Sequence, residues 1–320
     1  MFSLFCVFFF APIFIVEAEI EARETRKVTS CDKVASSIYD YERVADPVLE
    51  IENLSLAKSF CMNALDQDPE NPRLLFLVGR ILDLEERSYW EMSPGESYFR
   101  RAAEKGYIAA DFMLGEINNN VWGRTRFRRA FSSMLKAARA GHLEAMGRLS
   151  LFLGRRSAQN FRQEILELTK KAIALGHADA MAYLARGYIF ILADTDRHEE
   201  AINLLYEAER LGSLEASVAL GQLQTYEAVP AGIRTYIPEN TFGGLRRLLK
   251  AAEKGNKRGA FVLGVLYSGT TFAIPRNREK MIYWLCRSGR RGQYMVAELL
   301  DEDVTKYRCP RTRLHIERAG

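Results

Sequence analysis

The segment L-T-K-K-A-I-A-L-G-H-A-D-A-M-A-Y-L-A, residues 168–185, carries the pattern that decides the fold. An alanine lies four residues before Gly176, another lies four residues after it, and a leucine lies eight residues after it. Steps of four residues keep side chains on one face of a helix, and glycine readily takes the left-handed conformation that ends a helix. The segment therefore predicts a helix, a glycine turn and a second helix.

The same pattern recurs along most of the chain. Its turn glycines are separated by 35, 35, 36 and 43 residues, and a weaker copy follows after 34 more. They are Gly106, Gly141, Gly176, Gly212 and Gly255, with Gly289 as the weaker sixth. An upstream copy over residues 64–79 has Asp68 and Pro69 in place of the glycine. One set of alanine and leucine positions around a glycine would indicate only a buried helix face. Several copies in register predict a stacked array of helix pairs.

The shared pattern A-A-x-x-G-x-x-x-A-x-x-x-L-G, at a period near 36, resembles the Sel-one-like repeat, a relative of the tetratricopeptide repeat. The resemblance covers roughly residues 48–300. It implies an all-α fold, a right-handed superhelical solenoid of antiparallel helix pairs, with a concave face that binds other proteins. The last copy departs from the pattern after Gly289, where Gln293 stands in place of an alanine, as expected for a terminal cap. The family is defined by its scaffold, so the resemblance says little about function.

The N-terminal segment indicates where the protein is located. Residues 2–16 contain no charge and hold six of the 18 phenylalanines, and three glutamates follow within five residues. The run is shorter than the roughly 18 residues that a membrane-spanning helix needs. We therefore expect a cleaved signal peptide over residues 1–18, with cleavage near Ala18 or Ala22, and a periplasmic or secreted protein. No Lys or Arg precedes the run, so an uncleaved anchor and a mistaken start are the alternatives.

The rest of the chain divides into an N-terminal linker or cap (19–47), the repeat solenoid (48–300) and a basic C-terminal tail (301–320). Four cysteines follow the signal, two near each end of the repeats. In an oxidising compartment these positions predict that each terminal unit is closed by its own disulfide, because a terminal repeat lacks one stacking neighbour. The predicted pairs are Cys31 with Cys61 and Cys286 with Cys309. Four reduced thiols are the alternative.

No motif of a known catalytic class is present. The sequence contains no G-x-S-x-G, H-E-x-x-H, G-x-G-x-x-G, C-x-x-C or phosphate-binding loop, and its four histidines are not spaced as metal ligands. His142 and His177 each follow a turn glycine, one repeat apart. We therefore expect a protein that is not an enzyme and has no cofactor or metal. A hydrolase with a site dispersed along the groove is the alternative from another class.

Two groups of side chains are candidate contacts for a partner. The second helix of each pair carries polar residues that differ from repeat to repeat, among them Glu116, Arg148 and Arg186; an ordinary solvated face is the alternative. The connections opposite the glycine turns are irregular and rich in aromatic residues, which are candidate anchors on one rim or, alternatively, caps over the core. The rim candidates are Trp90, Trp122, Tyr226 and Tyr236.

The charge is unevenly distributed. The net charge of the whole chain is +4, but residues 240–320 hold 17 Lys and Arg against 7 Asp and Glu. This imbalance predicts an acidic protein or an anionic polysaccharide at the C-terminal end, where Arg287, Arg290 and Arg291 would steer association. A membrane surface is a further alternative, and nucleic acid is not expected for an exported protein. The run from Arg124 to Arg129 forms a second basic spot.

These observations together predict a non-enzymatic repeat scaffold or adaptor that mediates protein–protein interaction in the cell envelope or secretory pathway. The alternative within binding proteins is a component or regulator of an exopolysaccharide assembly or secretion complex.

Overall fold

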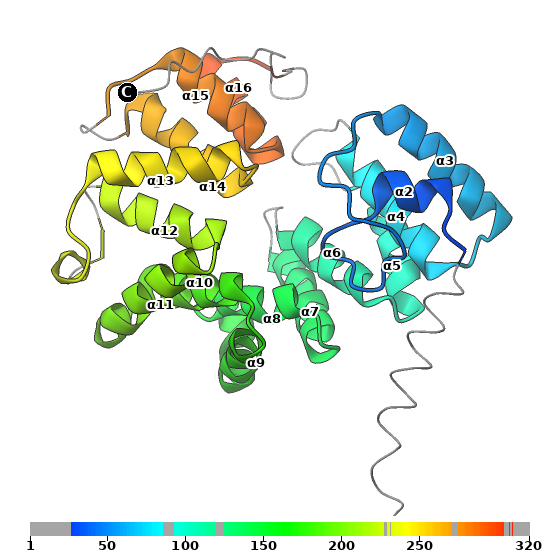
Figure 1. Cartoon of the computed structure of the whole chain (residues 1–320), viewed down its shortest axis with the longest axis horizontal. Coiled ribbons are helices and arrows are strands. Elements are labelled where there is room, and N and C mark those ends of the chain that lie inside the picture. The colour runs from blue at the N-terminus through cyan, green and yellow to red at the C-terminus, as the bar shows by residue number, and fades with distance from the viewer. Residues whose placement is uncertain are drawn as a thin grey trace, which may run out of the picture. The chain divides into compact units, whose positions relative to one another are not determined.

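The computed structural model describes residues 27–85, 93–119, 124–226, 229–230, 232–270, 274–303, 307 and 309. Within these ranges the chain forms helices and no strand, and the predicted all-α repeat fold is confirmed (Figure 1). None of these helices is long and apolar enough to cross a membrane. The chain divides into two compact units, which we call unit 1 and unit 2. Among the described residues, unit 1 runs to Leu114 and unit 2 begins at Gly115.

The described residues of unit 1 form four complete helices and the start of a fifth. They are α2 (Ser30–Ala35), α3 (Leu54–Gln67), α4 (Pro72–Leu84), α5 (Glu96–Glu104) and the first part of α6 (Ile108–Asn119). Asn71 caps α4, and Pro72 occupies its first turn, where its missing N–H does not matter. The core contains Phe76, whose ring lies 5.7 Å from that of Phe99 and 5.4 Å from that of Tyr107.

The segment before α3 is held against α4 by two arginines. Arg80 donates hydrogen bonds to the carbonyl oxygens of Ala35, Ser36 and Val48. Arg73 forms a buried ion pair with Asp32 at 2.5 Å. A disulfide joins Cys31 of α2 to Cys61 of α3. This part of the chain therefore forms a cap that is bonded to the first helix pair.

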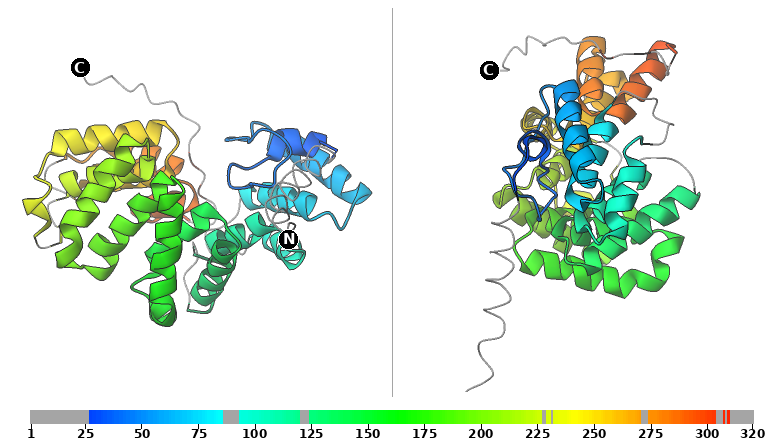
Figure 2. Two further views of the ribbon diagram at one scale, coloured as in Figure 1. Left: turned by 60° about the horizontal axis from the view of Figure 1, so that its bottom comes forward. Right: turned by 90° about the vertical axis from the view of Figure 1, so that its right-hand side faces the viewer.

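Unit 2 is itself an array of helix pairs (Figure 2). Its α-helices, after the end of α6, are α7 (Arg124–Arg139), α8 (Leu143–Arg148), α9 (Arg162–Ala174), α10 (Ala178–Arg186), α11 (His198–Arg210), α12 (Leu214–Thr225), α13 (Thr241–Glu253), α14 (Lys257–Val265), α15 (Arg278–Arg287) and α16 (Arg290–Leu300). Shorter helical segments join or extend them: η1 (Leu149–Phe152), η2 (Arg156–Phe161), η3 (Gly187–Leu192), η4 (Thr195–Arg197), η5 (Ile233–Thr235) and η6 (Leu266–Thr270).

The turn glycines have the predicted left-handed conformation. Their φ values lie between 83° and 98°, in both units and including Gly289. At Gly176 the amide of His177 donates to the carbonyl of Ala172 (3.1 Å) and that of Gly176 donates to Ile173 (2.9 Å). This pair of bonds is the Schellman arrangement, which satisfies carbonyl groups left open at the end of a helix.

The residue after the glycine begins the next helix as its N-cap. In α8 and α10 the Nδ1 atoms of His142 and His177 accept hydrogen bonds from the amides of Ala145 and Ala180. Ser213 and Asn256 cap α12 and α14 in the same way through their side-chain oxygens. The two histidines at equivalent positions therefore serve as helix caps.

The alanines and leucines that follow are buried as predicted: Leu149, Leu184, Leu220 and Leu263 are each at most 2% exposed.

The C-terminal repeat departs from the pattern for a visible reason. A Cβ atom on Gly292 would lie 2.0 Å from the carbonyl oxygen of Leu285, so this glycine permits close contact between α15 and α16. Gln293, in place of the usual alanine, donates a hydrogen bond to the carbonyl of Tyr307. A disulfide joins Cys286 of α15 to Cys309. The start of the predicted tail is thus bonded to the last helix pair.

Substitution of one turn glycine tests the contribution of its backbone conformation. A Cβ atom at Gly176 would meet nothing within 4 Å, so the only penalty is the φ of 83°. We expect Gly176→Val to lower the free energy of unfolding by about 2 kcal/mol, because β-branched residues resist positive φ. Gly176→Asn is the control and should lower the free energy of unfolding by less, since asparagine tolerates this conformation. Equal urea-denaturation midpoints for both variants would contradict the expectation.

Candidate functional site

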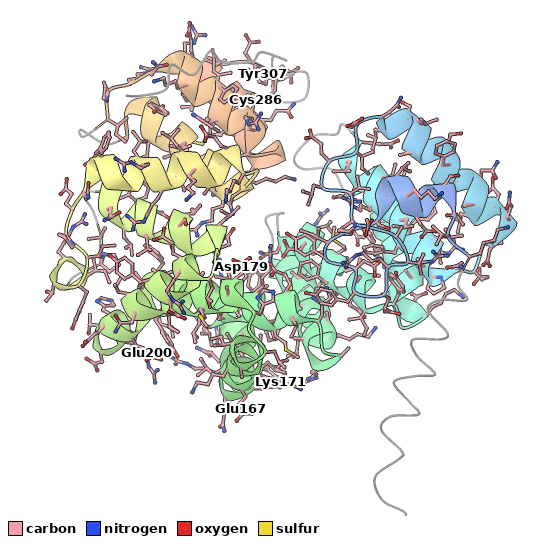
Figure 3. The ribbon with its side chains drawn as sticks, in the orientation of Figure 1. Glu167, Lys171, Asp179, Glu200, Cys286 and Tyr307 are labelled. Atoms are coloured by element: carbon pink, nitrogen blue, oxygen red, sulfur yellow. A yellow bond between two sulfur atoms is a disulfide. The ribbon has the colours of Figure 1, made fainter. Side chains whose placement is uncertain are left out.

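The candidate site lies on the inner side of unit 2. The helices follow a curve in which α9, α11 and α13 lie on the outer side and α10, α12 and α14 on the inner side (Figure 1). Neighbouring second helices contact one another, α8 with α10, α10 with α12, and α12 with α14. Figure 3 shows Asp179 of α10 on this inner side, whereas Glu167 and Lys171 of α9 and Glu200 of α11 lie on the outer side.

The repeat register decides which side chains reach the inner side. The buried alanine and leucine stand four and eight residues after each turn glycine, so positions three, seven and ten share a neighbouring face of the same helix. Up to the end of α14, most of these positions in unit 2 carry polar residues, and the exceptions are Leu151, Ala219, Val262 and Val265. We call the polar set the inner polar row. Its members are Glu116, Glu144, Arg148, Asp179, Tyr183, Arg186, Glu215, Gln222 and Arg258.

The first part of the row is centred on Glu144. Arg148 donates to Glu144 through Nε (2.6 Å) and to Glu116 through Nη1, so it links α8 to α6. The hydroxyl of Tyr183 donates to Glu144 at 2.8 Å, and Nε2 of His177 lies 3.2 Å from the other carboxylate oxygen. One carboxylate therefore connects three side chains from α8, α10 and the preceding turn.

Burial and these partners shift the titration of the cluster. Burial alone would raise the pKa of Glu144, but Arg148, His177 and Tyr183 outweigh it and lower that pKa to about 2. Burial raises the pKa of Glu116 despite the attraction of Arg148. Burial lowers the pKa of His177, but the bond to Glu144 prevails and raises it. Glu144 is therefore the fixed negative charge of this part of the row.

The second part is centred on Glu215. It accepts a hydrogen bond from Arg186 (3.2 Å) and one from Asn256 (2.9 Å), and Arg258 lies 3.7 Å away. Arg258 also donates to Gln222 at 2.7 Å. Burial, followed by repulsion from Arg258, lowers the pKa of Arg186 to about 9, which leaves it charged at neutral pH. Two guanidinium groups therefore share one carboxylate.

Two donor atoms of this second part are unsatisfied. Nε of Arg186 and Nη1 of Arg258 are buried and have no hydrogen-bond partner in the described part of the chain. Nη1 of Arg258 is the atom that lies 3.7 Å from Glu215, too far for a hydrogen bond. Buried polar atoms in folded proteins are almost always bonded, so each of these two donors has the capacity for one more acceptor. The side chains still reach solvent, with exposed fractions of 17% for Arg186 and 24% for Arg258. The arrangement suits a carboxylate or a backbone carbonyl group.

The other predicted contact residues lie elsewhere. Tyr226 ends α12 and is partly buried against the C-terminal core, while Tyr236 is 41% exposed after η5. Arg287 lies over the ring of Tyr283 and Arg291 over that of Phe261, on the last repeats. Trp90, Trp122 and the side chain of Arg290 lie outside the described residues.

Of the residues that share this face, Glu116, Arg148 and Arg186 were predicted contacts, whereas the residues at offset three were not. Glu144, Asp179, Glu215 and Arg258 all stand three residues after a turn glycine. That shared offset was the available signal, because it lies on the same helix face as offsets seven and ten. Among the described residues, no group of three or more histidine, cysteine or acidic side chains is placed to hold a metal ion.

The charge of Glu144 has a testable effect on stability. Its pKa is lower in the folded chain than the ordinary 4.5, so its stabilising contribution is present above pH 4.5 and is lost as the pH falls toward 2. We expect Glu144→Gln to lower the free energy of unfolding by about 2 to 3 kcal/mol at pH 7, and the difference from wild type to shrink below pH 4.5. Urea titrations between pH 7 and pH values below 4.5 measure the difference in unfolding free energy. The substitution Glu167→Gln on the outer side is the control. A difference that does not vary with pH would contradict the assignment.

Comparison with known proteins concerns the fold. No protein-family model matches the sequence, and no curated protein matches it. A Sel1 repeat protein from Oxalobacter formigenes is 20% identical over 73% of this chain and 93% of its own, with a TM-score of 0.44. A Sel1 repeat protein from Klebsiella pneumoniae is 22% identical over 64% of this chain and 99% of its own, with a TM-score of 0.40.

A protective antigen of uropathogenic Escherichia coli with an SLR fold is 16% identical, with a TM-score of 0.36. The match covers 91% of this chain and 58% of that protein. The fold follows from the geometry of the chain itself. Helix pairs joined by left-handed glycine turns, with buried alanine and leucine at fixed offsets, give this protein the Sel-one-like repeat fold.

Proposed function

We propose that this protein is an exported, non-enzymatic scaffold that binds another protein along the inner polar row of unit 2. The observation that carries the proposal is the pair of unsatisfied donors on Arg186 and Arg258. A scaffold of stacked repeats offers an extended surface without a central cleft, and partners bind such surfaces as extended segments. The role belongs to the cell envelope or the secretory pathway.

The chemistry of the row favours a polypeptide partner. Every residue of an extended peptide presents a carbonyl oxygen, and its acidic side chains and C-terminus present carboxylates. Arg186 and Arg258 lie on different repeats, α10 and α14, with Glu215 of α12 between them. A peptide that runs across these helices supplies acceptors to both arginines, while Glu215 and Gln222 keep the two side chains in place.

Export is supported by the two ends of the chain. Residues 2–16 read as a signal sequence, and the structure pairs the four cysteines that follow within their own terminal regions. Disulfides of this kind persist in oxidising compartments and are rare in the cytosol. The proposed mature protein begins after residue 18 and resides in the periplasm or outside the cell.

Site-specific crosslinking tests the proposed surface. Benzoylphenylalanine placed at Asp179 or Gln222 on the inner side should give one dominant adduct in the source cell, identified by mass spectrometry. The same group at Glu167 or Lys171 on the outer side should not give that adduct. Arg186→Ala with Arg258→Ala should then lose the partner in affinity capture. Arg210→Ala, which removes an exposed arginine of α11, should retain it. Adducts from the outer positions alone would overturn the proposal.

Cell fractionation tests the location independently. We expect the protein in the exported fraction, with an N-terminus directly after Ala18 or Ala22. Peptide mapping without reduction should recover Cys31 linked to Cys61 and Cys286 linked to Cys309. An intact N-terminus in the membrane fraction would show an anchor instead. Free thiols in a cytosolic protein would overturn export altogether.

A further inference from the structure

A second surface of unit 2, on α7 and η2, is far more basic than the rest of the chain. Residues 124–163 hold ten Lys and Arg and a single Glu. That glutamate, Glu144, is occupied on the inner polar row. Helix α7 carries six of the basic residues and no acidic one. This concentration of charge lies outside the C-terminal region in which the sequence analysis placed the main basic surface.

The basic residues surround a pocket. It has a volume of about 420 Å³ and is lined by Arg128, Phe131, Ser132, Leu135, Lys136, Arg139 and Phe161. We call it the α7 pocket. Six of these residues lie on α7, and Phe161 comes from the end of η2. The rings of Phe131 and Phe161 lie 5.5 Å apart and, with Leu135, form an apolar floor.

The rim of the α7 pocket is cationic and in part preorganised. Arg139 donates two hydrogen bonds to Glu164, at 2.7 and 2.9 Å, and lies 5.8 Å from the ring centre of Phe161. Arg128 and Lys136 are exposed on the same face of the helix. Among the described residues, Arg128 makes no hydrogen bond or ion pair, so its guanidinium remains available to a ligand.

Further cations lie on α7, on η2 and on the segments before and after η2. Arg155 lies over the ring of Phe127 at 4.8 Å, which keeps its charge at the surface. Arg129, Arg156 and Arg162 are exposed, and none of them makes a hydrogen bond or ion pair within the described part of the chain. Three cations line the apolar hollow, of which Arg139 is bonded to Glu164 and Arg128 makes no hydrogen bond or ion pair among the described residues. A ligand that matches this surface carries negative charge beside an apolar group.

We propose that the α7 pocket binds an acidic segment of another protein that carries one aliphatic or aromatic side chain between its carboxylates. The apolar side chain lies in the hollow, against the floor formed by Phe131, Leu135 and Phe161. The flanking carboxylates meet Arg128, Lys136 and Arg139, because guanidinium and ammonium groups bond carboxylates strongly. This surface is separate from the inner polar row, and the inference does not rest on the proposed function.

Other anionic partners fit the surface less well. A sugar chain stacks on exposed aromatic faces, yet the ring of Phe131 is only 5% exposed and forms the bottom of a hollow. A lipid surface is met by apolar side chains that project outward. No large apolar side chain of the described residues in 124–163 is exposed. The apolar hollow thus favours a peptide that inserts a side chain.

The probe is a fluorescein-labelled peptide of twelve residues, rich in glutamate and serine, with one central leucine. Its partner peptide has serine in place of that leucine. Fluorescence anisotropy with the full exported chain should show binding that weakens with salt, because exposed charges are screened over about 8 Å at physiological ionic strength. The serine peptide should bind about tenfold more weakly, since burial of a leucine side chain favours binding by at least this factor.

Variants of the protein separate the pocket from general charge. Arg128→Glu with Lys136→Glu should weaken binding at least about tenfold. Ser132→Trp fills the hollow without a change in charge. It should lower the affinity for the leucine peptide to the affinity that wild type has for the serine peptide. Lys254→Glu with Lys257→Glu makes the same charge change on exposed lysines at α13 and α14 and should have a much smaller effect. Circular dichroism confirms that each variant remains folded.

Three outcomes would overturn the proposal. Equal affinity for the leucine and serine peptides, or for polyglutamate, would show attraction by charge alone. Unchanged binding to Ser132→Trp would show that the hollow is not used. Binding to vesicles of anionic lipid or to heparin, without binding to the peptide, would assign the surface to another class of partner. The inner-row variant Arg186→Ala with Arg258→Ala should bind the peptide as wild type does, which keeps this test separate from that of the proposed function.

Discussion

The left-handed turn glycine is the constraint on which the other features of each repeat depend. It ends one helix, and the residue that follows it caps the next, so both helices are phased from a single position. Because a helix repeats every 3.6 residues, this phase then dictates which offsets are buried and which face the inner side. Histidine at the cap position illustrates the point, since its ring accepts an amide hydrogen bond from the first turn of the next helix.

The inner polar row shows how a repeat scaffold brings interacting polar side chains together on an open surface without a cleft. Several of its ion pairs join neighbouring second helices, as Arg148 joins α8 to α6 and Glu215 joins α12 to α10. Partly buried charges need such partners, because unpaired charge in a low-dielectric setting is unfavourable. The row therefore contributes to the stacking of repeats while Arg186 and Arg258 retain donor atoms for a ligand. Stability and recognition thus use the same side chains.

The two ends of the array are stabilised by different bonds. A terminal repeat lacks a stacking neighbour on one side, and closure of a loop by a disulfide compensates in part by restricting the unfolded chain. At the N-terminal end, Arg73 and Arg80 add a buried ion pair and three bonds to backbone carbonyls. At the C-terminal end, Gln293 replaces the alanine of the pattern and bonds the segment that returns from α16. Departures from the repeat thus occur where stacking ends.

The sequence by itself determined the helix pairs, their turns and their buried alanine and leucine positions, because these depend on local periodicity and on the backbone freedom of glycine. It also marked Glu116, Arg148 and Arg186 as exposed polar positions. Only the tertiary structure decided that Arg148 pairs with Glu116 and Arg186 with Glu215, since those contacts join different repeats and depend on how the helices pack. The α7 pocket has the same origin: Phe161 reaches Phe131 across thirty residues, and no local pattern encodes that contact.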